Sequence, residues 1–255
     1  MGTQNESKIT KLLGRHKPGT VLLAAWMEGM GISRDLQKRY RRSGWLESVG
    51  TGAFKRPSED VTWHGGLYAL QAEAELPIHA GAMTALAMQG LAHYARLGTD
   101  KVFLFSPPKT ILPAWFKNHD WGVLIKHVRT SVVPGAMGFT EHDEKTFSIN
   151  ISAPERAILE CLHLVPEVLD LMECFQVMEG LANLRPRLVQ QLLAASTSIK
   201  AKRLFLFLAE KANHQWFTLV DTSKLDLGKG HRRLAQGGVY VAKYGLTVPK
   251  ELATQ

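Results

Sequence analysis

The sequence predicts an α+β protein with an N-terminal winged helix-turn-helix domain followed by a mixed α/β, helix-rich C-terminal domain. A capped basic helix over residues 33–44 and a hairpin pattern around a Gly-Thr-Gly turn predict the first domain. Helical periodicity from residue 154 to residue 213 predicts the second. We place the boundary near residues 72–78, which gives domains of residues 1–74 and 75–255.

The basic helix has a start signal, an end signal and two distinct faces. Ser33 can cap it, because a serine hydroxyl accepts a hydrogen bond from a free backbone N–H of the first turn. Gly44 can end it in a left-handed conformation. At about 100° per residue, Leu36 and Tyr40 share an inward face. The opposite face is predicted to point outward and consists of Arg34, Gln37, Lys38 and Arg41.

The outward face has the chemistry of a DNA-reading surface. Arginine and glutamine side chains form bidentate hydrogen bonds with guanine and adenine in the major groove. Neighbouring cations, including Lys17, would hold phosphates. The predicted DNA-binding residues are Ser33, Arg34, Gln37, Lys38, Arg39, Arg41, Arg42, Lys55 and Arg56.

The segments on either side of this helix support a winged helix. Residues 7–15 predict a first helix, and residues 20–27 predict a short apolar second helix that ends at Gly29 and Gly31. Residues 45–49 and 53–56 alternate as two strands of a hairpin, with Lys55 and Arg56 near its end. Three helices followed by a hairpin form the order of a winged helix. The simpler alternative is a solvated basic helix beside an unrelated hairpin.

The rest of the chain predicts a second domain with fewer strands than helices. Helices are predicted over 62–75, 79–96, 154–164, 167–181, 186–196 and 198–213. Strands are predicted over 101–105, 121–125, 146–151, 215–220 and 238–244.

The net charge of +8 over 255 residues is concentrated at the two ends of the chain. Residues 1–70 carry a net charge of +5, residues 71–199 carry −3, and residues 200–255 carry +6. This distribution suggests two sites for anionic partners. The predicted second basic patch consists of Lys200, Lys202, Arg203, Lys229, Arg232 and Arg233. It would bind RNA, a nucleotide, DNA or an acidic protein surface; solvated lysines around a folded core are the alternative.

The cysteines and the hydropathy pattern predict a cytoplasmic protein. Cys161 and Cys174 lie in apolar helical contexts and outside any CxxC pair, which favours two buried thiols. The N-terminus is polar, without an apolar signal region. No window approaches the roughly 18 to 20 apolar residues of a membrane span, so we expect no membrane partner.

Signals of catalysis are weak. Asp143 and Lys145, with Asp120 upstream, are the residue types of a metal-dependent nuclease. However, the strand and turn pattern before them matches such a site poorly, and no proline precedes Asp120. The histidines have no HExxH spacing, and there is no GxSxG or Walker motif. We therefore expect no catalytic residue, metal site or cofactor. A DNA-targeted enzyme stays open as an alternative, for which Asp143→Ala is the test.

In the order of its motifs, the chain resembles the AbiEi antitoxins, which are transcriptional regulators of type IV toxin–antitoxin (abortive infection) systems. The resemblance rests on the winged helix, the hairpin over 45–52, and segments 79–94, 152–160 and 248–250. It implies a repressor in phage defence that binds inverted repeats at its own promoter. It also implies a C-terminal domain that counters a nucleotidyltransferase-like toxin without a stable complex.

Two points remain open at this stage. One winged helix buries too little surface for tight specific binding, so two copies would bind an inverted repeat, either as cooperative monomers or as a preformed dimer. The alternative function is a ligand-sensing winged-helix transcription factor without a toxin partner.

Overall fold

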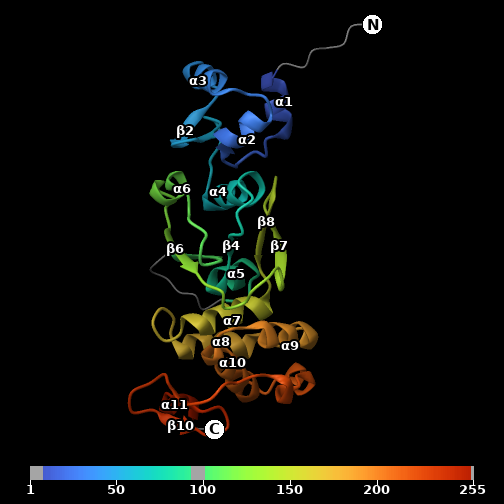
Figure 1. The fold of residues 1–255 in the computed structure, drawn as a ribbon, viewed down its shortest axis with the longest axis vertical. Coiled ribbons are helices and arrows are strands. Elements are labelled where there is room, and N and C mark those ends of the chain that lie inside the picture. The colour runs from blue at the N-terminus through green and yellow to red at the C-terminus, as the bar shows by residue number, and fades with distance from the viewer. Residues whose placement is uncertain (1–7, 93–100, 254–255) are drawn as a thin grey trace.

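The computed structural model describes residues 8–92 and 101–253, which form modules stacked along one long axis (Figure 1). The N-terminal helices and hairpin lie at one end, a five-stranded sheet comes next, and a layer of helices follows. A small β-module lies at the opposite end. The α+β class and the helix-rich C-terminal part are confirmed.

The N-terminal module contains three helices and a three-stranded sheet of order β1-β3-β2. Its elements are α1 (Lys8–Arg15), β1 (Leu22–Leu23), α2 (Ala24–Gly29), α3 (Arg34–Arg42), β2 (Glu47–Gly50) and β3 (Ala53–Lys55). The helix predicted over residues 20–27 is wrong at its start, because Leu22 and Leu23 pair with Phe54 and Ala53 of the hairpin. A short apolar run has no periodicity that separates a buried strand from a buried helix.

A small apolar core holds this module together. Leu12 of α1, Met27 of α2, Leu46 and Phe54 are all buried in it. Leu36 and Tyr40 pack against the same core, which confirms the inward face predicted for α3.

The middle module is a mixed sheet of order β6-β5-β4-β8-β7. Its elements are α4 (Trp63–Tyr68), a π-helix (Ala69–Glu73), β4 (His79–Ala80), α5 (Ala82–Met88), β5 (Lys101–Ser106), α6 (Ala114–Asn118), β6 (Leu124–Arg129), β7 (Phe139–Asp143) and β8 (Ser148–Ser152).

Two predictions for this module need correction, and one strand was missed. The strand predicted over 121–125 is displaced along the chain, because β6 spans Leu124–Arg129. The helix predicted over 79–96 begins only at Ala82, because His79 and Ala80 pair with β5 and β8 as the central strand. The helix also ends early, at Met88, and the last part of its predicted range, 93–96, lies outside the described residues. Strand β7 was not predicted, because Phe139 is its only apolar residue and the alternation signal is absent.

The four helices predicted after residue 154 are confirmed, with small shifts at their ends. They are α7 (Pro154–Leu164), α8 (Leu171–Gly180), α9 (Pro186–Ala195) and α10 (Ile199–Lys211). Cys161 and Cys174 are free, buried thiols within this layer, as predicted. None of the helices in the described part of the chain has the length and hydropathy needed to traverse a lipid bilayer.

The tail forms a second three-stranded sheet, of order β10-β11-β9. Its elements are two 3-10 helices (Gln215–Leu219 and Thr222–Lys224), β9 (Arg232–Arg233), β10 (Val239–Val241), β11 (Leu246–Val248) and α11 (Lys250–Ala253). The strand predicted over 215–220 is wrong. Trp216 fixes this segment as a helical turn, since its ring is buried and its Nε1 donates to the carbonyl of Leu181 at 2.8 Å.

Candidate nucleic-acid interface

Helix α3 begins and ends where the sequence signals predict. The Ser33 hydroxyl accepts a hydrogen bond from the backbone N–H of Leu36 at 3.4 Å. Gly44 follows the helix with a φ of +75°, the left-handed conformation that glycine adopts without steric cost. The helix lies at the far end of the molecule, away from the middle sheet (Figure 1). It is therefore placed to meet a partner without obstruction from the other modules.

The prediction that Gln37 faces outward is wrong. Its side chain is buried, with the residue only 3 % exposed. Its amide donates to the carbonyls of Ala24 at 3.1 Å and Ile32 at 3.0 Å. Gln37 therefore ties α3 to the start of α2 and to the turn between them, and it cannot reach a base edge in this conformation. Its angular position lies at the margin of the polar face, next to Tyr40, where the core begins.

The cations of α3 are all exposed, and they differ in whether an acidic side chain pairs with them. Arg34 is bidentate to Glu28 of α2, with Nε at 2.7 Å from Oε1 and a terminal nitrogen at 3.3 Å from Oε2. Lys38 lies 3.5 Å from Asp35. No ion pair engages Arg39, Arg41 or Arg42 among the described residues, so this half of the helix offers its positive charge to solvent.

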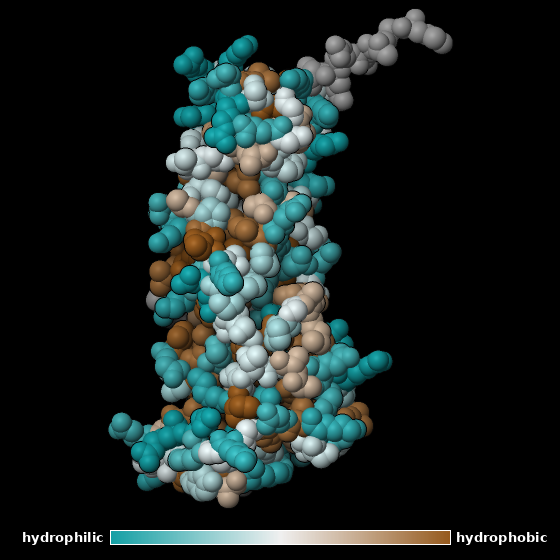
Figure 2. All heavy atoms as spheres, in the orientation of Figure 1, coloured by the Kyte–Doolittle hydropathy of each residue, from teal (hydrophilic) through white to brown (hydrophobic). Residues whose placement is uncertain are grey.

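Arg41 is the cation best placed to enter a groove. It shares the outward face with Arg34 and Lys38, and its guanidinium lies 5.8 Å from the centre of the Phe54 ring in the hairpin. This contact limits the directions in which the side chain points. Trp45, 49 % exposed just after the helix, adds an aromatic surface beside these cations that the sequence analysis did not single out. Figure 2 shows hydrophilic side chains gathered at this end.

The hairpin does not project freely as a wing. Its turn packs on α6, where a Cβ at Gly50 would come within 2.8 Å of Trp115, so only glycine fits. Lys55 and Arg56 lie at the other end of strand β3. Lys55 is 3.8 Å from Glu47, and Arg56 is 3.2 Å from Glu59. Both cations are half-buried and paired, so DNA would have to compete with these carboxylates for them.

The N-terminal module is joined to the rest of the chain by a close and partly charged junction. The backbone N–H of Leu23 donates to the Glu73 carboxyl of the π-helix at 2.7 Å. Burial raises the pKa of Glu73 to about 8, and the hydrogen bond from Leu23 opposes that rise. Gly65 lies so close to Gly19 that a Cβ would come within 1.9 Å of its carbonyl oxygen. The junction therefore fixes the position of α3 relative to the sheet.

The predicted second basic patch is wrong in half of its members. Lys202 and Arg203 are only 3 % and 5 % exposed. The Arg203 guanidinium donates to the carbonyls of Leu227 at 2.7 Å, Gly228 at 3.0 Å and Gly230 at 2.6 Å. Lys200 donates to the carbonyl of Val165 and lies 3.3 Å from Glu167. Lys200 and Arg203 donate to backbone carbonyls and Lys202 is buried, so these three residues do not form an open binding surface.

The other half of that patch lies on the surface of the tail. Lys229 and Arg233 are exposed, and Arg232 is half-buried. Residues 227–250 contain five lysines and arginines and no aspartate or glutamate. Arg203 donates to two backbone carbonyls of this cationic loop, those of Gly228 and Gly230. The loop lies at the end of the molecule opposite α3 (Figure 1).

A buried polar cluster in the middle module was missed by the sequence analysis. The Glu160 carboxylate accepts from His79 Nε2 at 3.0 Å and Arg156 Nε at 2.8 Å on one oxygen. Its other oxygen accepts from the Ala82 N–H at 3.1 Å and the Ser152 hydroxyl at 2.8 Å. Burial alone would raise the pKa of Glu160, but the His79 ring and the Arg156 guanidinium hold it below its ordinary value. The i, i+4 spacing of Arg156 and Glu160 was the one signal available.

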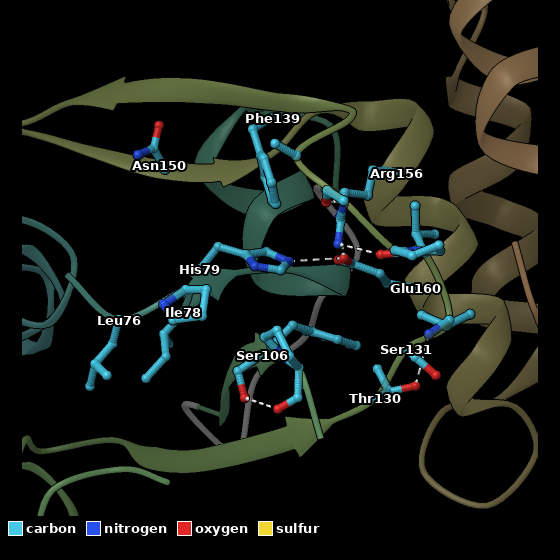
Figure 3. Close-up of a pocket in the computed structure, with 18 of the residues that line it drawn as sticks. Leu76, Ile78, His79, Ser106, Thr130, Ser131, Phe139, Asn150, Arg156 and Glu160 are labelled. Atoms are coloured by element: carbon cyan, nitrogen blue, oxygen red, sulfur yellow. Dashed lines mark hydrogen bonds and ion pairs between the residues drawn. The ribbon is translucent and has the colours of Figure 1, made fainter. Parts of the chain in front are cut away.

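Arg156 also organises the loop that follows β6. Its terminal nitrogens donate to the carbonyls of Met137 at 2.8 Å and Val133 at 3.2 Å. Its guanidinium lies 4.3 Å from the centre of the Phe139 ring. Figure 3 shows this cluster at the back of a cavity.

The residues of the nuclease alternative are not brought together. Asp120 precedes β6, and its carboxylate accepts from the Gly122 N–H at 2.9 Å. Asp143 ends β7 and accepts from the Ser148 hydroxyl at 2.7 Å. Because β6 and β7 are the opposite edges of the sheet, these carboxylates do not share a site.

Comparison with known proteins places the chain in a family. Residues 5–97 match the model described as "Transcriptional regulator, AbiEi antitoxin N-terminal domain", and residues 99–249 match "Transcriptional regulator, AbiEi antitoxin, Type IV TA system". No curated protein matches. The crystal structure of the RV2827C protein from Mycobacterium tuberculosis is similar in fold, with a TM-score of 0.57, 14 % sequence identity, and coverage of 94 % of this chain and 89 % of that one. The chain thus belongs to the AbiEi antitoxin family of transcriptional regulators of type IV toxin–antitoxin systems.

Proposed function

We propose that this protein represses its own operon by binding inverted repeats at the promoter through α3. The proposal rests on Arg39, Arg41 and Arg42, which are exposed on a capped helix at one end of the molecule and have no ion pair among the described residues. Arg41 and Arg34 are assigned to base edges, and Arg39 and Arg42 to phosphates.

The pairing of Arg34 with Glu28 adds a requirement to this proposal. Arg34 must leave a carboxylate to reach DNA, and the released Glu28 would then lie near the negatively charged backbone. Arg34 is 69 % exposed on its side chain, so the exchange costs little in this water-accessible position. Arg41 has no such competitor among the described residues, and we therefore assign it the larger share of affinity.

We further propose that residues 1–74 are the DNA-binding domain and residues 75–255 the antitoxin domain, acting in the cytoplasm against a nucleotidyltransferase-like toxin. The cationic loop with Lys229, Arg232 and Arg233 lies at the end opposite α3, so a second anionic partner could bind there while DNA occupies α3. A small-molecule regulator is the second candidate, and the cavity beside Glu160 is the observation that favours it.

A mobility-shift titration on the DNA upstream of its own gene tests the repressor proposal. It compares the wild-type protein with Arg34→Ala/Arg41→Ala, at two salt concentrations and against scrambled DNA. The matched control is Lys109→Ala/Lys145→Ala, which removes the same charge from exposed positions outside α3. We expect specific binding to be lost in the first variant and kept in the control. Equal binding of the wild type to promoter and scrambled DNA would refute the proposal.

A further inference from the structure

The middle module contains a cavity of about 840 Å³ that the proposed repressor and antitoxin roles do not use. The central strand β4 has only two residues, so the β5–β6 and β7–β8 pairs separate beyond it and leave a space between them (Figure 3). The space is closed behind by α7 and at one side by the loop after β6. Its volume lies within the usual range of small-molecule sites, roughly 300 to 1,000 Å³.

The walls of the cavity suit a flat aromatic molecule. The apolar part of the lining includes Phe105, Phe139, Ile78, Val132 and Val133. The Phe139 ring meets the His79 ring edge-on, with centroids 4.7 Å apart. Aromatic and aliphatic walls with a few fixed polar groups are typical of sites for small organic ligands.

The charges in the lining favour a neutral ligand. Arg156 is the one cationic side chain among the described residues that line the cavity. Its guanidinium is already engaged by Glu160 and by the carbonyls of Val133, Gly135 and Met137. No free cation is left in the described lining to neutralise a phosphate or carboxylate, and Glu75 at the edge would repel one.

His79 leaves one polar atom without a partner at the back of the cavity. The residue is 6 % exposed, and its Nε2 donates to the Glu160 carboxylate at 3.0 Å. Because a carboxylate only accepts, Nε2 carries a proton, and in the Nε2–H tautomer Nδ1 is an acceptor. No described residue donates to Nδ1. His79 lines the cavity, and its Nδ1 is not one of the fully buried atoms that lack a partner, so a ligand N–H or O–H group can donate to it in place of water.

The mouth of the cavity offers neutral polar side chains. Asn150 is exposed at the rim, and its backbone N–H donates to the Gln71 side chain at 2.9 Å, which fixes its position. Ser131 is exposed on the other side of the opening. These side chains can bond to hydroxyl groups that remain partly in water.

From these features we infer that the cavity is a binding site for a nucleoside-like ligand: a neutral, planar nitrogen heterocycle with an N–H donor and a hydroxylated substituent. The ring would lie beside Phe139, its N–H would donate to His79 Nδ1, and its hydroxyls would contact Asn150 and Ser131. The inference does not depend on the DNA-binding role of α3.

Isothermal titration calorimetry of the full chain with adenosine, guanosine, cytidine and uridine tests the inference. At least one nucleoside is expected to bind saturably at submillimolar concentration. Adenosine is then compared with purine riboside, which lacks the exocyclic amine, and with adenosine monophosphate. Loss of one hydrogen bond is expected to weaken binding about three- to tenfold. The phosphate should give no gain, since no described lining cation is free for it.

Two variants locate the site. His79→Gln keeps a donor toward Glu160 but replaces Nδ1 by an amide oxygen at a different position, so the preference for adenosine over purine riboside should fall. Asn150→Trp, at an exposed position, narrows the mouth and should weaken every nucleoside that binds. Lys109→Ala is the matched surface control and should change nothing. If none of the four nucleosides binds at millimolar concentration, or if Asn150→Trp leaves binding unchanged, the inference is wrong; this holds even if His79→Gln does not fold.

Discussion

Helices α3 and α10 are both rich in lysine and arginine, yet their cations are in opposite environments. In α3 the cations lie on the surface and Leu36 and Tyr40 reach the core from one side only. In α10 every residue from Ala201 to Ala209 is buried, so Lys202 and Arg203 are buried with them. The difference shows that apolar residues on every face of a helix, rather than its charge, decide whether its cations are available to a partner.

Arg203 of α10 and Arg34 of α3 have hydrogen-bond partners that follow from these environments. Arg203 satisfies its donors with backbone carbonyls of the tail, which makes it part of the fold. Arg34 is paired with a carboxylate that is itself accessible to water. Substitution of a buried arginine leaves its carbonyl partners without donors, whereas water takes the place of an exposed arginine that is substituted.

Arg203→Ala gives the largest expected effect and tests the buried side of the comparison. It removes the donors to the carbonyls of Leu227, Gly228, Gly230 and Gly245 and leaves a cavity, so we expect a loss of about 4 kcal/mol in the free energy of unfolding. Urea denaturation followed by circular dichroism measures it, with Arg42→Ala as the exposed control, expected within about 0.5 kcal/mol. Similar losses for the two variants would remove the distinction between α10 and α3.

Glu73→Gln extends the comparison to a buried acid at the junction. The pKa of Glu73 is raised to about 8 in the folded protein, so the carboxyl ionises more easily when the chain unfolds. The buried Glu73 carboxyl therefore does not destabilise the folded protein below about pH 4.5. The destabilisation grows between pH 4.5 and 8 and is constant above pH 8. The amide should stabilise the protein by up to about 3 kcal/mol at pH 7. A stability difference that does not change between pH 5 and 8 would contradict this.

Gln37→Ala separates the buried residue of α3 from its exposed neighbours. It removes the bonds to Ala24 and Ile32, so we expect a loss of about 1.5 kcal/mol in stability and weaker promoter binding through poorer docking of the helix. Arg41→Ala should show the reverse, with unchanged stability and lost specific binding. Thermal denaturation and fluorescence anisotropy on the same samples measure both. A stable Gln37→Ala protein with altered base preference would mean that Gln37 reads DNA.

Arg232→Glu/Arg233→Glu gives the smallest expected change in stability, within about 0.5 kcal/mol, because both side chains reach the surface. Promoter binding should be retained. Neutralisation of the partner toxin, measured as growth after co-expression, should be lost. Retained neutralisation and retained DNA binding together would show that the cationic loop serves neither partner.

Capping and periodicity gave the correct architecture wherever the local signal was strong. Ser33 with Gly44 set the limits of α3, and Pro154 at the first turn set the start of α7. The tail segment 215–220 depended on a distant contact of Trp216, which local pattern does not contain. The exposure of the α3 cations was predicted, but the burial of Gln37 depends on its contact with Ala24, and the packing of the hairpin turn depends on Trp115, which lies far along the chain.

The Glu160 cluster could not be predicted for the same reason. Its donors come from β4, β8, the start of α5 and α7, and only the Arg156–Glu160 pair is local in sequence. Burial of a carboxylate with four donors is visible only once the chain has folded.

The most direct test of the central claim is the salt dependence of promoter affinity, measured by fluorescence anisotropy for the wild type, Arg39→Ala/Arg42→Ala and Arg232→Ala/Arg233→Ala. Each lost phosphate contact lowers the slope of log K against log salt by about 0.9. We predict that the slope falls by about two per protomer in the α3 variant and stays unchanged in the tail variant. A slope that falls only in the tail variant would contradict the assignment of DNA binding to α3.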